Sequence, residues 1–242
     1  MGVVVSRSRQ MVARETLSQA AAAAIRDMIV IGELPPGAPL RLDMLAERLS
    51  MSISPVREAL PQLVMLGLVE HVAYRGATVT RLSLDEVEAI HEARCALESV
   101  VVRRVAERFT DEVGRELERL LQELEGAYEA GDRLRVVRGN TAFHRALAEF
   151  SGSALHQRLT AQIYNAWERY RAVLITGEHP NQTFAEEAAG HRQIVDACRR
   201  GDPEAAEEAL RRHLYISHTI LDRVSGQFLT QVDQRLSTGR GS

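Results

Sequence analysis

Three histidines and an asparagine are the residues of this chain best suited to chemistry: Asn140, His144, His191 and His213. Asn140 and His144 are four residues apart, so on a helix they share one face. Each of the four lies in a segment with helical spacing of apolar side chains, and the helices of a bundle can direct such groups to one interior point. Imidazole nitrogens and an amide oxygen can bind a divalent metal, and three imidazoles favour zinc or nickel over magnesium or calcium.

Alternatives to this metal site follow from the same residues. A single histidine on a helix is usually an ordinary core or surface group, so the prediction requires the four residues to converge. Three-histidine zinc sites also occur in hydrolytic enzymes, where the ion activates a water molecule. Catalysis would need a general base beside the ion, and no residue near the four is an obvious one. We therefore expect a binding site, with no catalytic residues, rather than an enzyme.

A second group of polar residues is typical of a protein that reads DNA. Ser52, Ile53, Ser54 and Arg57 precede or begin a predicted helix, and a helix-turn-helix places this end of its second helix against base edges. Arg57 is one turn into the helix, where a guanidinium can reach phosphate or guanine. Arg75-Gly76 lies at the predicted tip of a hairpin, where it can approach a groove. An ordinary capped helix and a surface hairpin would show the same local pattern.

The elements that carry the DNA-reading residues come first in the chain. Apolar spacing and turn signals predict three helices and then two short strands, at residues 16–31, 42–49, 54–66, 68–72 and 77–80. We expect Ser54 to cap the third helix and Pro55 to open it, because proline suits the first helical position. This order is that of a winged helix-turn-helix.

The pattern after residue 81 is entirely helical. Six helices are predicted, at residues 83–109, 111–131, 132–151, 154–175, 183–200 and 203–228. Ser83 and Glu86 have the spacing of a capping box, and Asp132 is the expected cap of the third of these helices. The predicted fold class is mainly α: an N-terminal winged helix-turn-helix followed by an all-α antiparallel helical bundle, with a boundary near residues 81–83.

Composition excludes several other classes of protein. The 242 residues have a net charge of -3, and all 30 basic residues are arginine. Residues 1–81 hold nine arginines and seven acidic residues, so a mildly basic first third precedes an acidic remainder. Two cysteines make no disulfide framework. The apolar run at residues 20–31 is too short to cross a bilayer, and residues 1–14 lack an apolar signal core, so we expect a cytoplasmic protein without a membrane partner.

Residues 16–81 resemble, without a gap, the DNA-binding domain of the GntR family of bacterial repressors and activators. The matching string comprises Ile25–Ile29, Gly32-x-x-x-Pro36-Gly37, Leu40, Leu45-Ala46, Ser54-Pro55-Val56-Arg57-Glu58-Ala59-Leu60, Leu63, Gly67-Leu68-Val69 and Arg75-Gly76-Ala77-x-Val79. The resemblance implies that Arg57 and the residues before it face the operator and that Arg75-Gly76 enters the minor groove.

One position departs from this family pattern. The family usually has Ser-Arg-Thr-Pro-Val-Arg where this chain has Ser52-Ile53-Ser54-Pro55-Val56-Arg57. The arginine that commonly reads a guanine is thus replaced by Ile53. Isoleucine can contact a thymine methyl group but cannot donate a hydrogen bond. We expect an operator unlike the usual family half-site, with weaker discrimination in favour of guanine.

Residues 83–225 resemble the FCD effector domain, which marks the FadR-like branch of the family. The matching residues are Asn140-x-x-Phe143-His144, Glu187-x-x-x-His191-x-x-Ile194-x-x-Ala197, Ala209-x-x-x-His213-Leu214 and Arg94-x-x-x-Glu98. In that domain an aspartate and three histidines bind a divalent metal, and a small carboxylic acid completes its coordination. Here Asn140 stands at the aspartate position, which leaves the ligand set without a negative charge and implies weaker metal retention.

Arg94 is the candidate second anchor for the effector carboxylate, because arginine binds carboxylates in a bidentate manner. An ion pair between Arg94 and Glu98, one turn further on, is an equally good reading. Tyr164, Trp167 and Arg171 share a helix face and belong either to the cavity or to the core. His156 and the remaining histidines have no metal spacing.

Together these features predict a ligand-responsive transcriptional regulator, expected to be a repressor, that binds double-stranded operator DNA as a homodimer. We expect a flexible arm at residues 1–15, the DNA-binding domain at 16–81, the effector and dimerisation domain at 82–230 and a flexible tail at 231–242. The expected ligands are a divalent metal ion and a small carboxylate. A metal-independent regulator that responds to an acyl thioester is the first alternative, and a metal-dependent hydrolase with an accessory winged helix is the second.

Overall fold

Three helices and a two-stranded antiparallel sheet form the first part of the chain, as predicted. The computed structural model describes residues 16–72, 76–81, 83–176 and 180–216. The elements are α1 (Leu17–Val30), α2 (Leu42–Arg48), α3 (Ile53–Met65), β1 (Val69–Val72) and β2 (Gly76–Val79). One hydrophobic core, built from side chains between Ala21 and Val79, joins them. The predicted winged helix-turn-helix is therefore confirmed.

The start of α3 differs from the prediction. Ser52, not Ser54, is the N-cap residue, and its side chain makes no capping hydrogen bond. Ser54 instead lies inside the first turn, where its hydroxyl donates to Glu58 Oε1 at 3.0 Å. Pro55 at the third helical position costs no hydrogen bond, because the first four amides of a helix have no partner within it. The helix consequently extends back to include Ile53.

A third short segment that was not predicted adds to the wing. The amide of Leu40 donates to the Ala77 carbonyl at 2.8 Å, and the amide of Val79 donates to the Ala38 carbonyl at 2.9 Å. Residues 38–40 thereby pair with β2 on the edge away from β1. Gly76 begins β2 with a φ of 74°, a left-handed conformation that favours glycine after the hairpin turn.

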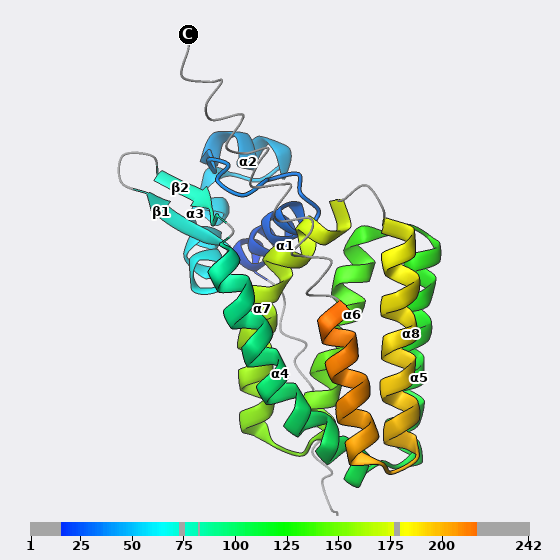
Figure 1. The fold of residues 1–242 in the computed structure, drawn as a ribbon. Helices are drawn as coiled ribbons and strands as arrows, with labels where there is room; N and C mark the ends of the chain where they lie inside the picture. The colour runs from blue at the N-terminus through cyan, green and yellow to red at the C-terminus, as the bar shows by residue number, and fades with distance from the viewer. Residues whose placement is uncertain (1–15, 73–75, 82, 177–179, 217–242) are drawn as a thin grey trace, which may run out of the picture.

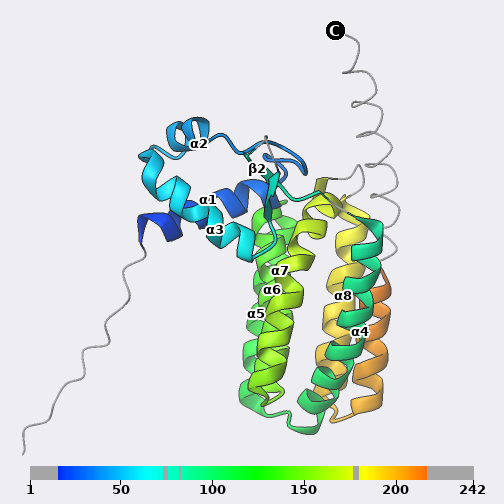
Figure 2. The same ribbon diagram turned by 90° about the vertical axis from the view of Figure 1, so that its left-hand side faces the viewer.

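The rest of the described chain is an upright helical bundle, with the winged helix at one end (Figures 1 and 2). Its elements are α4 (Leu84–Glu107), α5 (Asp111–Glu129), α6 (Arg133–Phe150), α7 (Ala154–Thr176), α8 (Pro180–Arg199) and a helical segment at residues 203–216. A second hydrophobic core lies between these helices. Among the described residues, no helix has the length and apolar character needed to cross a membrane.

Most helix boundaries in the bundle agree with the local signals. Asp132 caps α6 by accepting from the Arg135 amide at 3.0 Å, as expected. The capping box at Ser83 does not form, since the Ser83 side chain makes no capping hydrogen bond and its amide donates to Tyr170 Oη at 3.4 Å. α8 begins three residues earlier than predicted, at Pro180. The part of the last predicted helix beyond residue 216 lies outside the described residues.

The winged helix contacts the bundle through α1, which packs against α6 and α7. Val30, at the end of α1, joins a small apolar cluster with Leu124, Ala127 and two valines of α6. Two ion pairs cross the same junction: Arg26 with Glu168 of α7, and Asp27 with Arg138 of α6. α6 therefore contacts the winged helix directly.

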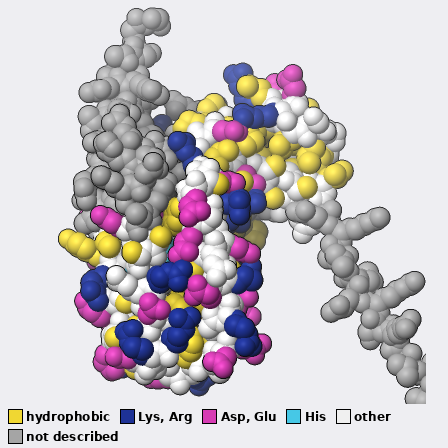
Figure 3. Space-filling view, turned by 90° about the vertical axis from the view of Figure 1, so that its right-hand side faces the viewer, with side chains coloured by type: hydrophobic (Ala, Val, Ile, Leu, Met, Phe, Trp, Pro, Cys, Tyr) yellow, Lys and Arg dark blue, Asp and Glu magenta, His cyan; other side chains and the backbone are white. Residues whose placement is uncertain are grey.

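The surface of the bundle carries charges of both signs. On the face formed by α5 and α8, arginines and acidic side chains alternate (Figure 3). Arg192 pairs with Glu118 and Glu125, and Arg119 pairs with Glu116 and Glu123. Such paired charges give little net potential, so this face is a solvated surface rather than a surface for nucleic acid.

Candidate functional site

The three predicted metal-ligating histidines meet inside the bundle. His144 comes from α6, His191 from α8 and His213 from the helical segment at 203–216, and all three are buried. One ligand nitrogen from each lies within 4.8 Å of the others. Nitrogens bound to one zinc ion lie roughly 3–4 Å apart, so a small contraction of this cluster would accommodate an ion.

Asn140 lies beside the histidines, as its spacing from His144 predicted. Its Oδ1 atom is 3.1 Å from Nε2 of His191, and the side chain is buried. The amide Nδ2 has no hydrogen-bond partner among the described residues. A buried donor without a partner costs about 1–3 kcal/mol of folding free energy. An asparagine at this position therefore destabilises the fold unless its oxygen also binds a ligand such as a metal ion. The four residues together offer three nitrogens and one oxygen, a donor set that suits zinc or nickel.

Glu98 of α4 orients His144. The Nδ1 atom of His144 lies 2.7 Å from Glu98 Oε2, so a proton on Nδ1 would face the carboxylate and leave Nε2 as the possible metal ligand. Carboxylates behind metal-binding histidines commonly play this part. Burial alone would raise the pKa of Glu98, but Arg94 and His144 outweigh it and lower the pKa to about 2. Glu98 is thus ionised over the whole working pH range.

Arg94 is fully buried behind Glu98. Its Nε donates to Glu98 Oε1 at 2.8 Å, and its Nη2 donates to the hydroxyl of Tyr164 at 2.5 Å. The guanidinium also lies 4.5 Å from the ring centre of Trp167. The ion pair with Glu98, given above as the alternative role of Arg94, is therefore present. Arg94 therefore balances the charge of Glu98 behind the ligand set.

Tyr164 forms one wall of the site. Of the two alternatives given by the sequence, cavity or core, it therefore belongs to the cavity. Its ring stacks on the imidazole of His144, with the centroids 5.1 Å apart, and its hydroxyl donates to Glu98 at 3.2 Å. Burial raises the pKa of Tyr164, so the hydroxyl stays protonated and remains a donor. The side chain of Arg171 is not among those described.

Gly190 makes room for His213. A Cβ atom at this position would lie 2.7 Å from His213 Nδ1 and 3.2 Å from its Cβ. The missing side chain lets α8 and the segment at 203–216 approach closely enough for His191 and His213 to meet, with their ring centroids 4.1 Å apart. Sequence reasoning did not assign this glycine a role, although a helical glycine directly before a candidate ligand is a usable signal.

Replacing Gly190 with alanine is expected to displace the His213 ring and to weaken metal binding at least tenfold, comparable to the effect of losing a residue that orients a ligand. Metal affinity is measured by competition with a chelating dye. Gly126→Ala is the matched control, because Gly126 is also helical and a Cβ there meets nothing within 4 Å. Equal metal affinity in the two variants would contradict this role for Gly190.

The predicted DNA-facing residues lie together at the exposed start of α3. Ser52, Ile53, Ser54 and Arg57 are all exposed, whereas Val56, Ala59, Leu60 and Leu63 of the same helix are buried. Ile53 is 43% exposed, so its side chain is available for contact with DNA. Gly76 is exposed at the start of β2. Arg75 lies outside the described residues.

Comparison with known proteins places both parts of the chain. Residues 17–79 match the family described as bacterial regulatory proteins, gntR family, and residues 89–215 match the FCD domain. A protein of Paenarthrobacter nicotinovorans described as "Probable D-xylose utilization operon transcriptional repressor" is 35% identical over 201 residues, which cover 80% of this chain and 85% of that protein.

A further relative and a solved structure each match most of this chain. The transcriptional repressor NanR of Cronobacter sakazakii is 29% identical over 232 residues, covering 86% of each chain. The solved structure of McbR from E. coli is 26% identical, covers 86% of this chain and 98% of its own, and superposes with a TM-score of 0.74. The arrangement of a winged helix ahead of a helical bundle is shared with McbR.

Proposed function

Because this chain belongs to the GntR family of bacterial transcriptional regulators and carries an FCD domain, we propose that it is a repressor controlled by a metal-bound carboxylate effector. The relatives described above are transcriptional repressors, and the chain is a regulator rather than an enzyme. The observation that carries the proposal is the convergence of His144, His191 and His213 inside a bundle whose helix α6 also contacts the DNA-reading unit.

Each part of the chain has one task in this proposal. Residues 16–81 read the operator in the cytoplasm, and residues 82–230 bind the effector and join two copies. One small winged helix contacts too few phosphates for tight specific binding, which favours a homodimer on a palindromic operator. α4 and the start of α7 expose Val100, Leu155 and Leu159, apolar side chains that suit burial between two copies.

Asn140, His144, His191 and His213 would hold the divalent ion, zinc or nickel. When bound, the ion supplies a positive centre that attracts the carboxylate of the effector. The four side chains bring no charge of their own, and Arg94 and Glu98 cancel each other. These ligands would therefore cancel none of the ion's charge, which would attract an anionic effector.

Arg94 is the proposed second anchor for the effector. Its partner Glu98 also contacts His144, so an incoming carboxylate that draws Arg94 away would alter the contact between Glu98 and His144. This gives the effector a route to α6. A coupling of about 1–3 kcal/mol is enough to change operator occupancy several-fold or more.

A gel-shift titration of the protein on its own upstream DNA tests the proposal, with and without chelator and with a panel of small carboxylic acids. Release of DNA by an acid only when zinc or nickel is present supports it. Release by an acyl thioester after chelation would favour the metal-independent alternative, and binding that responds to neither would overturn effector control.

Ile53 is proposed to set operator preference. Ile53→Arg is expected to shift the selected half-site toward guanine at one position, since a bidentate arginine–guanine pair contributes about 1–3 kcal/mol of discrimination. Selection from a randomised DNA pool measures the change. The control is Met44→Arg on α2, also exposed, which adds the same charge and should raise affinity for all sequences alike. A wild-type protein that selects the common family half-site would contradict the role given to Ile53.

A further inference from the structure

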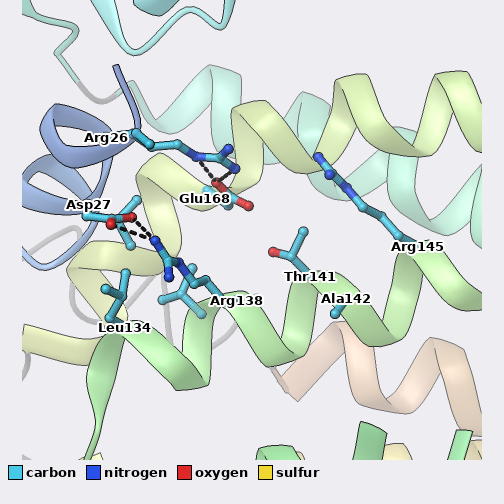
Figure 4. Close-up of a pocket in the computed structure, with 11 residues that line it drawn as sticks. Arg26, Asp27, Leu134, Arg138, Thr141, Ala142, Arg145 and Glu168 are labelled. Atoms are coloured by element: carbon cyan, nitrogen blue, oxygen red, sulfur yellow. Dashed lines mark hydrogen bonds and ion pairs between the residues drawn. The ribbon is translucent and has the colours of Figure 1, made fainter. Parts of the chain in front are cut away.

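A cavity of about 350 Å³ lies where α1 meets α6 and α7, outside the histidine cluster (Figure 4). Small-molecule sites occupy roughly 300–1,000 Å³, so this cavity has room for a small metabolite. Ala23, Val30, Leu134, Val137 and Ala142 provide its apolar lining. Its remaining residues are charged or polar, and they come from both the winged helix and the bundle.

Two ion pairs connect the walls of this junction cavity. Arg26 of α1 pairs with Glu168 of α7, with Nε 2.9 Å from the carboxylate. Asp27 of α1 accepts from Nη2 of Arg138 at 2.7 and 2.6 Å. Each acidic side chain is thus neutralised by an arginine from the opposite wall, and the two pairs together add no net charge.

Arg145 is the third arginine of the cavity lining, and it is not part of either ion pair. Its Nη2 donates to the neutral Oδ1 of Asn165 at 3.0 Å, and its buried Nε has no hydrogen-bond partner among the described residues. No carboxylate of the described chain lies within ion-pair distance of it. A guanidinium in a partly enclosed cavity is strongly stabilised by a negatively charged partner.

The hydroxyl of Thr141, one turn before Arg145 on α6, is a second hydrogen-bond donor available to a ligand. The residue is only 5% exposed, and its Oγ1 atom has no hydrogen-bond partner among the described residues. Figure 4 shows Thr141 and Arg145 on the α6 wall, with Arg26 and Glu168 across the cavity. A buried hydroxyl without a partner costs about 1–3 kcal/mol, so a ligand that accepts from it would recover free energy.

We propose that this cavity is a second ligand site, which binds a small oxyanion through Arg145 and Thr141. The group recognised is a carboxylate or a phosphate, since both accept two charge-assisted hydrogen bonds from one guanidinium. The neighbouring residues Asn140 and His144 serve the histidine cluster from another face of α6. The second site therefore needs no metal and is distinct from the proposed effector site.

The position of the cavity gives such a ligand a direct route to the DNA-reading unit. Its walls include Arg26 and Asp27 of α1. These two residues lie between Ile25 and Met28, which are part of the hydrophobic core of the winged helix. An anion at Arg145 would also interact with Arg26 and Arg138 and compete with Glu168 and Asp27 for them. Occupancy of the cavity would then alter the contact between the two units.

Calorimetric titration of the full chain with orthophosphate and, separately, with succinate tests the proposal at constant ionic strength. Each titration is performed with zinc and after removal of metal by a chelator. We expect one anion per chain to bind the metal-free protein. Arg145→Gln should weaken this binding at least about tenfold, and Thr141→Val should weaken it less, because one neutral hydrogen bond contributes less than a charged one. The stronger of the two probes identifies the recognised group.

Arg135→Gln is the matched control, because Arg135 is exposed on the same helix and does not line the cavity. It removes the same charge and should leave anion affinity unchanged. Binding of both anions only with zinc present, equal affinity in Arg145→Gln and Arg135→Gln, or no saturable binding of either anion would overturn the proposal. Retained zinc affinity in Arg145→Gln shows that the variant is folded and separates a failure here from a failure of the metal site.

Discussion

Replacing His191 with alanine is expected to abolish stoichiometric metal binding and, with it, the response to a carboxylate effector. His191 lies at the centre of the cluster, 4.1 Å from His213 by ring centroid and 3.1 Å from the Asn140 oxygen. Loss of a supporting residue already weakens metal sites by about 10–100-fold, and loss of a direct ligand from a set of four should weaken this one further. Metal content after dialysis against trace zinc measures the effect.

The same change should remove the stabilisation that metal gives to the fold. An ion present at 100 times its dissociation constant contributes about 2.7 kcal/mol, which raises the Tm of a chain of this size by about 5–10 °C. Chelation should lower the Tm of the wild type by that amount and leave His191→Ala unchanged. His156→Ala is the control, because His156 lies outside the cluster and contacts Ser151 instead. His191→Gln, which fills more of the space, guards against an effect of the cavity alone.

The second large effect is expected from Asn140→Asp, which restores the charge that the family resemblance implies. An aspartate oxygen beside three imidazoles should increase zinc affinity by roughly tenfold or more, since charged oxygen ligands bind a divalent ion more strongly than neutral ones. The added negative charge should at the same time weaken the binding of a carboxylate effector. Zinc and effector affinities, measured on the same preparation, are therefore expected to change in opposite directions.

Gln122→Glu controls for net charge, because Gln122 is exposed on α5 and the change adds one negative charge outside the site. Neither affinity should respond to it. If Asn140→Asp left zinc affinity unchanged while His191→Ala abolished binding, Asn140 would be a neighbour of the ion rather than one of its ligands. Parallel gains in zinc and effector affinity would contradict the electrostatic argument.

Local patterns were sufficient for most of the fold. Asp132 predicts the start of α6 because its carboxylate accepts from an amide only three residues away, and this bond needs no help from the rest of the molecule. Ser83 shows where such signals fail. Its capping box is replaced by a bond from the Ser83 amide to Tyr170, a residue that only the packing of α4 on α7 brings near.

The candidate site divides in the same way. The spacing of Asn140 and His144 places them on one helix face, which any α-helix guarantees. Whether His191 and His213 join them depends on how closely α8 and the segment at 203–216 pack, and Gly190 permits that approach. The spacing of Arg94 and Glu98 predicted an ion pair, but its burial against Tyr164 and Trp167 follows from helices far apart in sequence.

The sequence by itself determined the helix periods, the winged helix-turn-helix, the family and the identity of the candidate ligands, because each depends on residue types at short fixed spacings. Only the tertiary structure decided that three histidines on three helices meet, and that Glu98 supports one of them. It also decided that Arg26 reaches Glu168, 142 residues away, beside a cavity where Arg145 Nε has no hydrogen-bond partner within the described part of the chain. Such contacts arise from the packing of whole helices, which no local spacing specifies.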